Sequence, residues 1–171
     1  MGAFIGYFIQ RWRFFALASS ALMLAIAHGF ETFGGFAPCT LCLRQREVYW
    51  VAAGLALVGM AVVRLPRGRR WRAAFDGALA LVFLVGLATA VYHAGAEWKF
   101  WPGPGACSGG GGAVSAQAMT NLLGGAKIRP PACDHAPWVF LGLSMAGWNA
   151  LVSLKLTVLS LMAMARDRRP S

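Results

Sequence analysis

Charged residues are scarce in this chain: only 13% of its 171 residues are Asp, Glu, Lys or Arg, whereas 58% are hydrophobic. An ordinary soluble domain is about 25% charged, so these side chains are too few to cover a soluble surface of this size. The hydrophobic content excludes a disordered chain, and four cysteines are too few for a disulfide-dense secreted scaffold. The composition therefore predicts that much of the apolar surface faces lipid.

Four apolar stretches are long enough to cross a bilayer, which takes about 20 residues. They cover residues 14–30, 44–63, 73–95 and 138–165. Small residues recur at four-residue spacing on the last two stretches, which lets helices approach one another closely in lipid. We expect an all-α membrane protein with a single domain over residues 1–171, built as a four-transmembrane-helix bundle with two extracytoplasmic loops.

Lys and Arg are distributed unequally between the two sides of these spans. Ten lie on one side, in the N-terminal tail, the connection over residues 64–72 and the C-terminal tail, and five lie on the other. Positively charged residues stay on the cytoplasmic side of a membrane, so we expect both termini in the cytoplasm. The net charge of +10 would also suit a nucleic-acid-binding protein, but the basic residues flank apolar runs and no recognition motif accompanies them.

The first apolar stretch also resembles a cleavable signal peptide, because Arg11 and Arg13 precede a run that contains Ala25-Ile26-Ala27. The run has 17 residues, which is longer than the apolar region of a typical signal peptide. We therefore expect this segment to remain as the first span.

All four cysteines fall in the two predicted outer segments, where thiols tend to form disulfides. Cys39 and Cys42 form a CxxC pair directly before the second span, and such pairs occur where thiol and disulfide interconvert. The helix N-terminus favours a thiolate there. Arg46 follows Cys42 by four residues and shares its helix face, so it is a candidate to stabilise that thiolate or to polarise a bound carbonyl oxygen. Arg44 points elsewhere, and we expect it to anchor the helix at the lipid headgroups.

The second cysteine pair has a different environment. Cys107 precedes four consecutive glycines, Gly109 to Gly112, and such a flexible backbone suits a cysteine that changes partners. Cys133 follows 26 residues later. The modestly apolar stretch between them is a candidate for a short helix that lies on the membrane surface. The alternative for this pair is a disulfide that only staples the loop.

The ordered motifs resemble those of the DsbB family over nearly the whole chain. They are Pro38-Cys39-Thr40-Leu41-Cys42 with Arg46, Tyr92-His93 before a Trp-Pro-Gly-Pro run, Cys107, Cys133-Asp134, the segment Trp138-Val139-Phe140-Leu141-Gly142-Leu143-Ser144-Met145, and Trp148. DsbB proteins are inner-membrane thiol–quinone oxidoreductases that reoxidise the periplasmic dithiol oxidase DsbA. The resemblance implies the same activity, a bacterial inner-membrane location and cysteines on the periplasmic side.

The resemblance also implies roles for individual residues. Cys39–Cys42 would be the redox-active disulfide next to a ubiquinone or menaquinone, with Arg46 at its edge and His93 near the quinone. Cys107–Cys133 would be the pair that exchanges with a DsbA-like partner. The partner's thiolate would attack Cys107, released Cys133 would attack Cys39, and Cys42 would leave as a thiolate facing the quinone.

Three alternatives remain open from the sequence. A protein similar to the vitamin K epoxide reductase group also joins a CxxC pair to a quinone, but its cysteine order fits less well. A zinc site with four cysteine ligands is a second alternative, although the other two cysteines lack the close spacing of zinc ligands, and we expect no metal. A structural or transport bundle with stapled loops is the third, and it leaves Arg46 and the glycine run unexplained.

Overall fold

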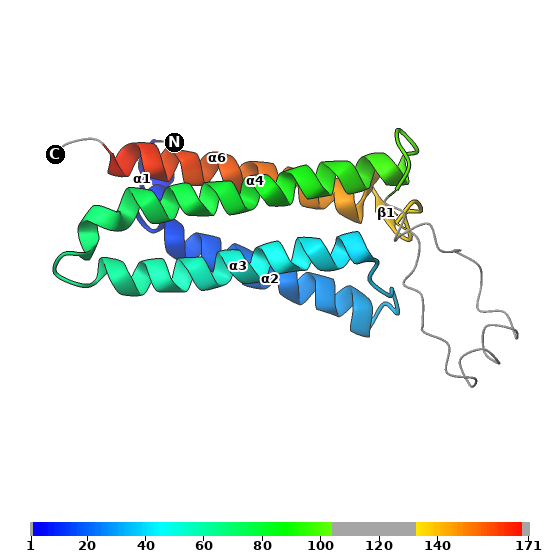
Figure 1. Ribbon diagram of the computed structural model, residues 1–171, viewed down its shortest axis with the longest axis horizontal. Coiled ribbons are helices and arrows are strands. Elements are labelled where there is room, and N and C mark those ends of the chain that lie inside the picture. The colour runs from blue at the N-terminus through cyan, green and yellow to red at the C-terminus, as the bar shows by residue number, and fades with distance from the viewer. Residues whose placement is uncertain (1, 104–132, 169–171) are drawn as a thin grey trace, which may run out of the picture.

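The computed structural model describes residues 2–103 and 133–168, and long helices dominate it (Figure 1). Four helices are long and apolar enough to cross a membrane: α2 (Trp12–Thr32), α3 (Thr40–Val63), α4 (Arg72–Glu97) and α6 (Met145–Asp167). A short helix, α1 (Gly2–Gln10), precedes them, and the 3-10 helix η1 (Gly68–Trp71) leads into α4. The predicted all-α, four-span membrane architecture is confirmed.

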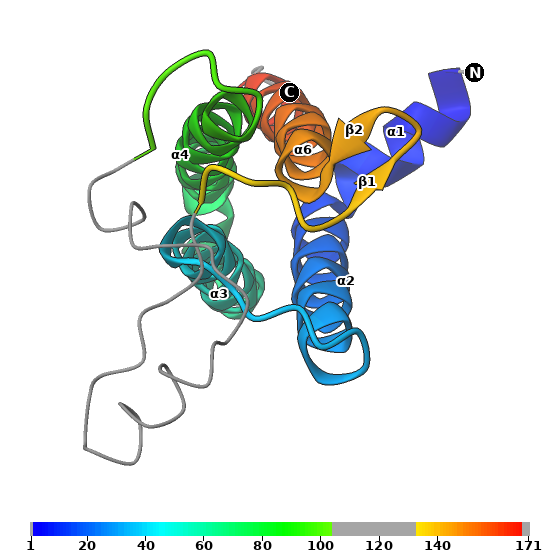
Figure 2. The ribbon, with the colours of Figure 1, turned by 90° about the vertical axis from the view of Figure 1, so that its right-hand side faces the viewer.

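The four long helices form one bundle, which Figure 2 shows from its end. Helix α4 packs against α6 and α3, and α3 packs against α2. Close packing needs small residues: a Cβ added to Gly86 of α4 would lie 2.9 Å from the Val48 side chain of α3 and 3.4 Å from Ser153 Oγ of α6. The small residues predicted to line helix contacts therefore include one at a three-helix junction.

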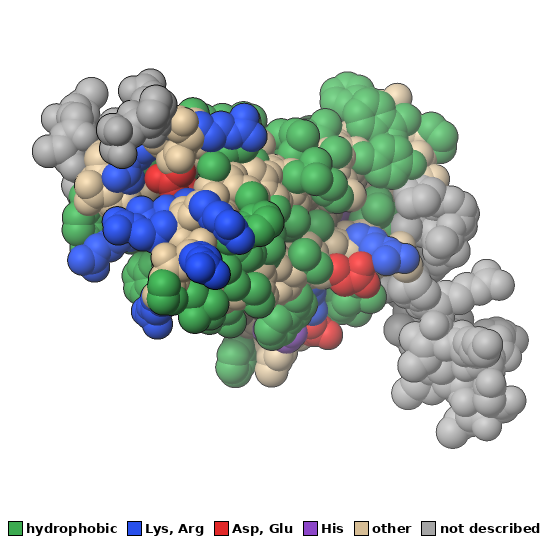
Figure 3. Space-filling model, turned by 60° about the vertical axis from the view of Figure 1, so that its left-hand side comes forward, with side chains coloured by type: hydrophobic (Ala, Val, Ile, Leu, Met, Phe, Trp, Pro, Cys, Tyr) green, Lys and Arg blue, Asp and Glu red, His purple; other side chains and the backbone are tan. Residues whose placement is uncertain are grey.

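Basic side chains lie at one end of the bundle, together with both termini and the α3–α4 connection (Figures 1 and 3). Arg13 of α2 is half-buried there and donates through Nη1 to Asp76 Oδ1 of α4 at 2.8 Å, while its Nη2 lies 3.6 Å from Asp167 Oδ2 of α6. Next to it, Trp12 Nε1 donates to Ser160 Oγ at 3.0 Å. We refer to this end, opposite the cysteines, as the inner end.

The prediction that the fourth span begins at residue 138 is wrong. Residues before α6 form a small hairpin instead, in which β1 (Val139–Phe140) pairs antiparallel with β2 (Leu143–Ser144). The turn places Leu141 and Gly142 at φ values of 50° and 79°, a left-handed pair that suits a tight hairpin. Ser144 then caps α6, because its Oγ accepts from Gly147 N at 3.1 Å.

The other three spans extend up to four residues beyond their predicted starts or ends, since hydropathy locates the apolar core of a helix better than its polar ends. The predicted surface helix between Cys107 and Cys133, and the glycine run, lie outside the described residues.

Candidate functional site

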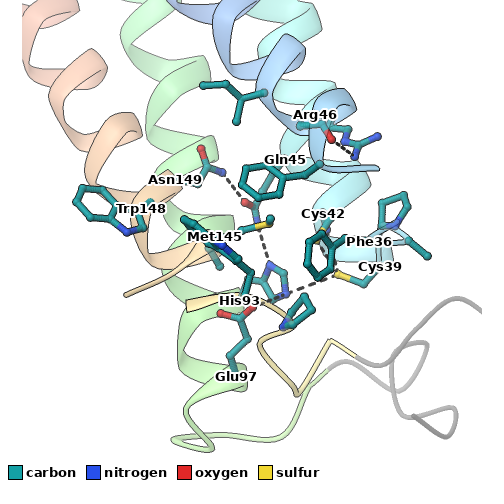
Figure 4. A pocket seen from close by; sticks show the side chains of 18 of the residues that line it. Phe36, Cys39, Cys42, Gln45, Arg46, His93, Glu97, Met145, Trp148 and Asn149 are labelled. Carbon is teal, nitrogen blue, oxygen red and sulfur yellow. Dashed lines mark hydrogen bonds and ion pairs between the residues drawn. The ribbon is translucent and has the colours of Figure 1, made fainter. Parts of the chain in front are cut away.

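The end of the bundle opposite the inner end, which we call the outer end, encloses a cavity of about 920 Å³. Four spans and the segment around the hairpin contribute to its wall, and Figure 4 shows it from close by. Most of the lining is aromatic or aliphatic. The polar and sulfur-containing groups in the wall are Cys39, Cys42, Gln45, Arg46, Tyr49, His93, Glu97, Lys99, Asp134, His135 and Asn149, together with the Met side chains. Small-molecule sites in proteins combine an apolar wall with few polar groups in this way.

The CxxC pair lies at the start of α3, in the wall of this cavity. Cys39 is the N-cap of the helix, and its Sγ accepts a hydrogen bond from the backbone N–H of Cys42 at 3.3 Å. The two Sγ atoms lie 3.1 Å apart, and both residues are free thiols. Hydrogen bonding to Cys42 and, more weakly, to His93 outweighs the effect of burial and lowers the pKa of Cys39 to about 4. The sulfur at which the structure favours a thiolate is therefore that of Cys39, and not that of Cys42, to which the sequence pattern pointed.

Cys133 lies against this pair although it is distant in the sequence. It is 1% exposed and disulfide-bonded. Its Sγ lies within 4.8 Å of both Cys39 Sγ and a ring nitrogen of His93, and 3.5 Å from Thr40 Oγ1. These are the atom types that bind zinc, but a disulfide-bonded sulfur is not the thiolate that zinc requires. The structure thus brings together three of the four predicted redox cysteines, Cys39, Cys42 and Cys133. The fourth, Cys107, lies outside the described residues.

His93, the histidine that the sequence predicted to lie near the quinone, lies against the CxxC pair. It is 3% exposed, and its Nε2 lies 3.6 Å from Cys39 Sγ and 3.6 Å from Glu97 Oε1. Its Nδ1 lies 3.0 Å from Gln45 Nε2. Glu97 was not predicted as a site residue, although its position four residues after His93 on one helix was a usable signal.

Arg46 also lines the cavity, one helical turn after Cys42, as its spacing predicts. Its guanidinium forms an ion pair with Glu31 of α2, and its Nη2 donates to the Ala27 carbonyl oxygen at 3.0 Å. The charge that was expected to stabilise a Cys42 thiolate is therefore held by an acidic partner. Arg44 reaches Glu47 at the protein surface, with 72% of its side chain exposed, in keeping with an anchoring role.

Two buried amides that sequence reasoning missed belong to the same wall. Gln45 and Asn149 are each 7% exposed, and Asn149 Nδ2 donates to Gln45 Oε1. Polar amides inside otherwise apolar spans were the available signal, because an amide in lipid requires partners.

Comparison with known proteins gives a consistent result. The family model described as "Disulfide bond formation protein DsbB" matches residues 10–163. A protein named Disulfide bond formation protein B from Aromatoleum aromaticum is 30% identical, over 90% of this chain and 97% of the relative. Proteins of the same name from Nitrosococcus oceani and Nitrosomonas europaea are 30% and 29% identical, over 91% and 84% of this chain and 92% and 82% of the relatives. No solved structure matches the chain.

Proposed function

We propose, from the premise that this chain belongs to the DsbB family of disulfide bond formation proteins, that it is a protein-dithiol:quinone oxidoreductase. It reoxidises a DsbA-like periplasmic dithiol oxidase and passes the electrons to membrane quinone. The observation that carries the proposal is the position of Cys39. Its sulfur lines the membrane-embedded cavity and at the same time lies within 4.8 Å of Cys133 Sγ.

The thiol chemistry proceeds by exchange between four cysteines. A thiolate of the partner attacks Cys107 of the Cys107–Cys133 disulfide, and Cys133 leaves as a thiolate. Cys133 then attacks Cys39 of the Cys39–Cys42 disulfide, so that a Cys39–Cys133 bond forms and the electron pair leaves on Cys42. The partner's second thiolate attacks the mixed disulfide between the partner and Cys107, so that the partner's disulfide forms and Cys107 leaves as a thiolate. Each exchange breaks one S–S bond and forms another.

The cavity suits a ubiquinone or menaquinone by its size and chemistry. Its volume of about 920 Å³ lies within the roughly 300–1,000 Å³ of small-molecule sites, and aromatic side chains such as Phe30, Phe36 and Trp148 supply flat apolar walls. Arg46 is the cation in the wall that suits a quinone oxygen, and Cys42 presents its sulfur to the same space. When bound, a quinone accepts two electrons and two protons.

The distribution of charge supports an orientation for this site. The arginines of the inner end favour the cytoplasm, so both termini are cytoplasmic and the cysteines face the periplasm. A multi-pass protein of the bacterial inner membrane with this orientation meets periplasmic thiols at one end of the bundle and membrane quinone in the cavity below it.

A turnover assay with the purified full chain tests the proposal. Mixing it with a reduced DsbA-like protein and a short-chain quinone should consume two partner thiols per quinone reduced. With Cys39 and Cys42 both changed to Ser, the oxidised protein should oxidise one equivalent of partner and stop. With Cys107 and Cys133 both changed to Ser, partner oxidation should become very slow, because a bulky thiol protein cannot easily reach a pair at the bilayer surface.

Two results would contradict the proposal. Rapid multiple turnover without Cys107 and Cys133 would indicate a direct CxxC reductase, as in the vitamin K epoxide reductase group. Alkylation of the native protein provides the other. The proposal predicts two disulfides, so that none of the four cysteines reacts with the reagent. Four cysteines that react after chelation would instead indicate a zinc site.

A further inference from the structure

A line of buried hydrogen bonds runs through the bundle and ends at the CxxC pair (Figure 4). Tyr49 Oη donates to Asn149 Oδ1, and Asn149 Nδ2 donates to Gln45 Oε1. Gln45 Nε2 lies 3.0 Å from His93 Nδ1, and His93 Nε2 lies 3.6 Å from Cys39 Sγ. The first four side chains are between 3% and 7% exposed, so water does not compete for these bonds.

The two amides give this line a direction. A carboxamide accepts only through its oxygen and donates only through its nitrogen. The oxygen of Gln45 already accepts from Asn149, so the nitrogen of Gln45 faces the imidazole and donates to it. Nδ1 of His93 must then be the unprotonated nitrogen, which leaves the single proton of a neutral ring on Nε2.

The contacts of His93 Nε2 require the same donor-to-acceptor direction along these hydrogen bonds. His93 Nε2 meets Cys39 Sγ and Glu97 Oε1, both at 3.6 Å, and both are acceptors when ionised. Oε1 is the carboxyl oxygen of Glu97 that faces Nε2, and its Oε2 is buried without a hydrogen-bond partner among the described residues. A reversed line would place the Nε2 lone pair against two acceptors, which is electrostatically unfavourable.

We infer that Gln45 and Asn149 are positioning residues that keep the His93 proton on Nε2, so that the imidazole is a fixed hydrogen-bond donor to the Cys39 sulfur. His93 is then not a base that removes a proton from Cys39. The lowered pKa of Cys39 agrees with such a donor.

The role of this donor rests on the proposed function. To restore the Cys107–Cys133 disulfide, a Cys107 thiolate attacks Cys133 of the Cys39–Cys133 disulfide, which leaves Cys39 and Cys42 reduced for the quinone to reoxidise. The Cys107–Cys133 bond forms, the Cys39–Cys133 bond breaks, and the electron pair leaves on Cys39 Sγ. A donor held at Cys39 stabilises this leaving group, and a better leaving thiolate leaves faster.

Several groups besides the imidazole act on the Cys39 sulfur or its surroundings. They are Cys42 and Arg46 of α3, Glu97 of α4, and Cys133, Asp134 and His135 of the segment before β1. Substitution of Asn149 removes none of these groups and changes no charge. A change in the titration of Cys39 in such a variant therefore reports on the hydrogen-bonded line.

Nitrogen NMR of the full chain, labelled with ¹⁵N-histidine, tests the tautomer directly. His93 is assigned as the signals lost in His93→Gln. We expect a protonated Nε2 and an unprotonated Nδ1 in the wild type. Asn149→Leu should produce a mixture, because the Gln45 amide is then able to turn, and Thr157→Val, two turns further along α6, should leave the signals unchanged. A wild-type proton on Nδ1, or an unchanged tautomer in Asn149→Leu, would overturn the inference.

A second measurement follows the thiolate. In a Cys42→Ser background, the ultraviolet absorbance of the Cys39 thiolate gives its titration midpoint. Asn149→Leu should raise this midpoint by about one pH unit, roughly tenfold in acidity, and Thr157→Val should not move it. An unmoved midpoint in Asn149→Leu would contradict the inference. Neither measurement uses a quinone or a partner protein, so failure here is distinct from failure of the turnover assay.

Discussion

The two ends of the bundle both bury ionisable side chains, but they differ in how those groups are paired. At the inner end, Arg13 is enclosed by two carboxylates, Asp76 and Asp167, that hold it from two other helices. At the outer end, Cys39 and His93 adjoin a cavity of about 920 Å³. A fully paired cluster fixes helices relative to one another, whereas incompletely paired groups beside a cavity remain available for chemistry. The comparison predicts that substitutions at the inner end lower stability and those at the outer end lower turnover.

The largest effect is expected for Cys39→Ser at the outer end. Turnover should fall by roughly 10³-fold or more, because no other group replaces the Cys39 sulfur in the exchange between the Cys107–Cys133 pair and Cys42. Serine is a good helix N-cap, so at pH 4.5, where the Cys39 thiolate contributes little stability, the thermal unfolding midpoint should stay close to that of the reduced wild type. An unfolding midpoint that falls as far as that of an inner-end variant would break the comparison.

Arg13→Met should have the next largest effect, on stability. It leaves Asp76 buried without its cation, which costs about 3–5 kcal/mol of unfolding free energy. Turnover per folded molecule should stay within twofold of the wild type. The matched control is Arg11→Met, which removes a neighbouring arginine that contacts only the Tyr7 ring among the interactions described for it, and should cost less than about 0.5 kcal/mol. Equal losses in the two variants would show that the inner cluster is not a special source of stability.

Arg46→Met sharpens the comparison within the outer end. Removing the positive charge of Arg46 from the cavity wall should weaken quinone-coupled turnover by about tenfold, close to 1.4 kcal/mol, through a higher KM for quinone. Thiol exchange with the partner should be largely unaffected. Arg44→Met is the control, since Arg44 lies at the surface with Glu47. If both variants were equally impaired, interfacial anchoring would be the better account of Arg46.

The smallest effect concerns pH. The pKa of Cys39 is lowered to about 4, so its thiolate stabilises the reduced native protein. This contribution is complete above the pKa of an unfolded thiol, about 8.5, and is lost as the pH falls through about 4. From pH 8 to pH 4.5 the unfolding midpoint of the reduced protein should drop further than that of Cys39→Ser, because most of the stability contributed by the thiolate is lost over this range. Parallel pH curves for the two proteins would contradict a thiolate at Cys39.

Local sequence signals predicted much of the outer end. The apolar run after Cys42 located α3 to within four residues of its start at Thr40, and the four-residue spacing placed Arg46 in the same wall as Cys42. These predictions succeeded because helical spacing fixes which residues share a face. The partner of Arg46 was not predictable in the same way, since Glu31 belongs to another helix.

The contacts that sequence reasoning missed are non-local. The approach of Cys133 to Cys39 joins residues 94 positions apart, and no spacing rule covers such a distance. The hairpin before α6 was missed for another reason: its residues are as apolar as a span, and only Gly142 and Ser144 marked a turn and a helix cap. Hydropathy alone does not separate an apolar hairpin from a helix.

The hydrogen bonds of the first span bear on how the protein is made. Arg13 pairs with a residue 63 positions later, and Trp12 bonds to a residue 148 positions later. At a synthesis rate of about 5–20 residues per second, Ser160 leaves the ribosome roughly 7–30 seconds after Trp12. During that interval α2 resides in the bilayer with Trp12 unpaired, while Arg13 gains Asp76 of α4 earlier and Asp167 of α6 only at the end. Both α2 and α4 thus complete their contacts only when α6 is present, and completion of α6 is the event that closes the bundle.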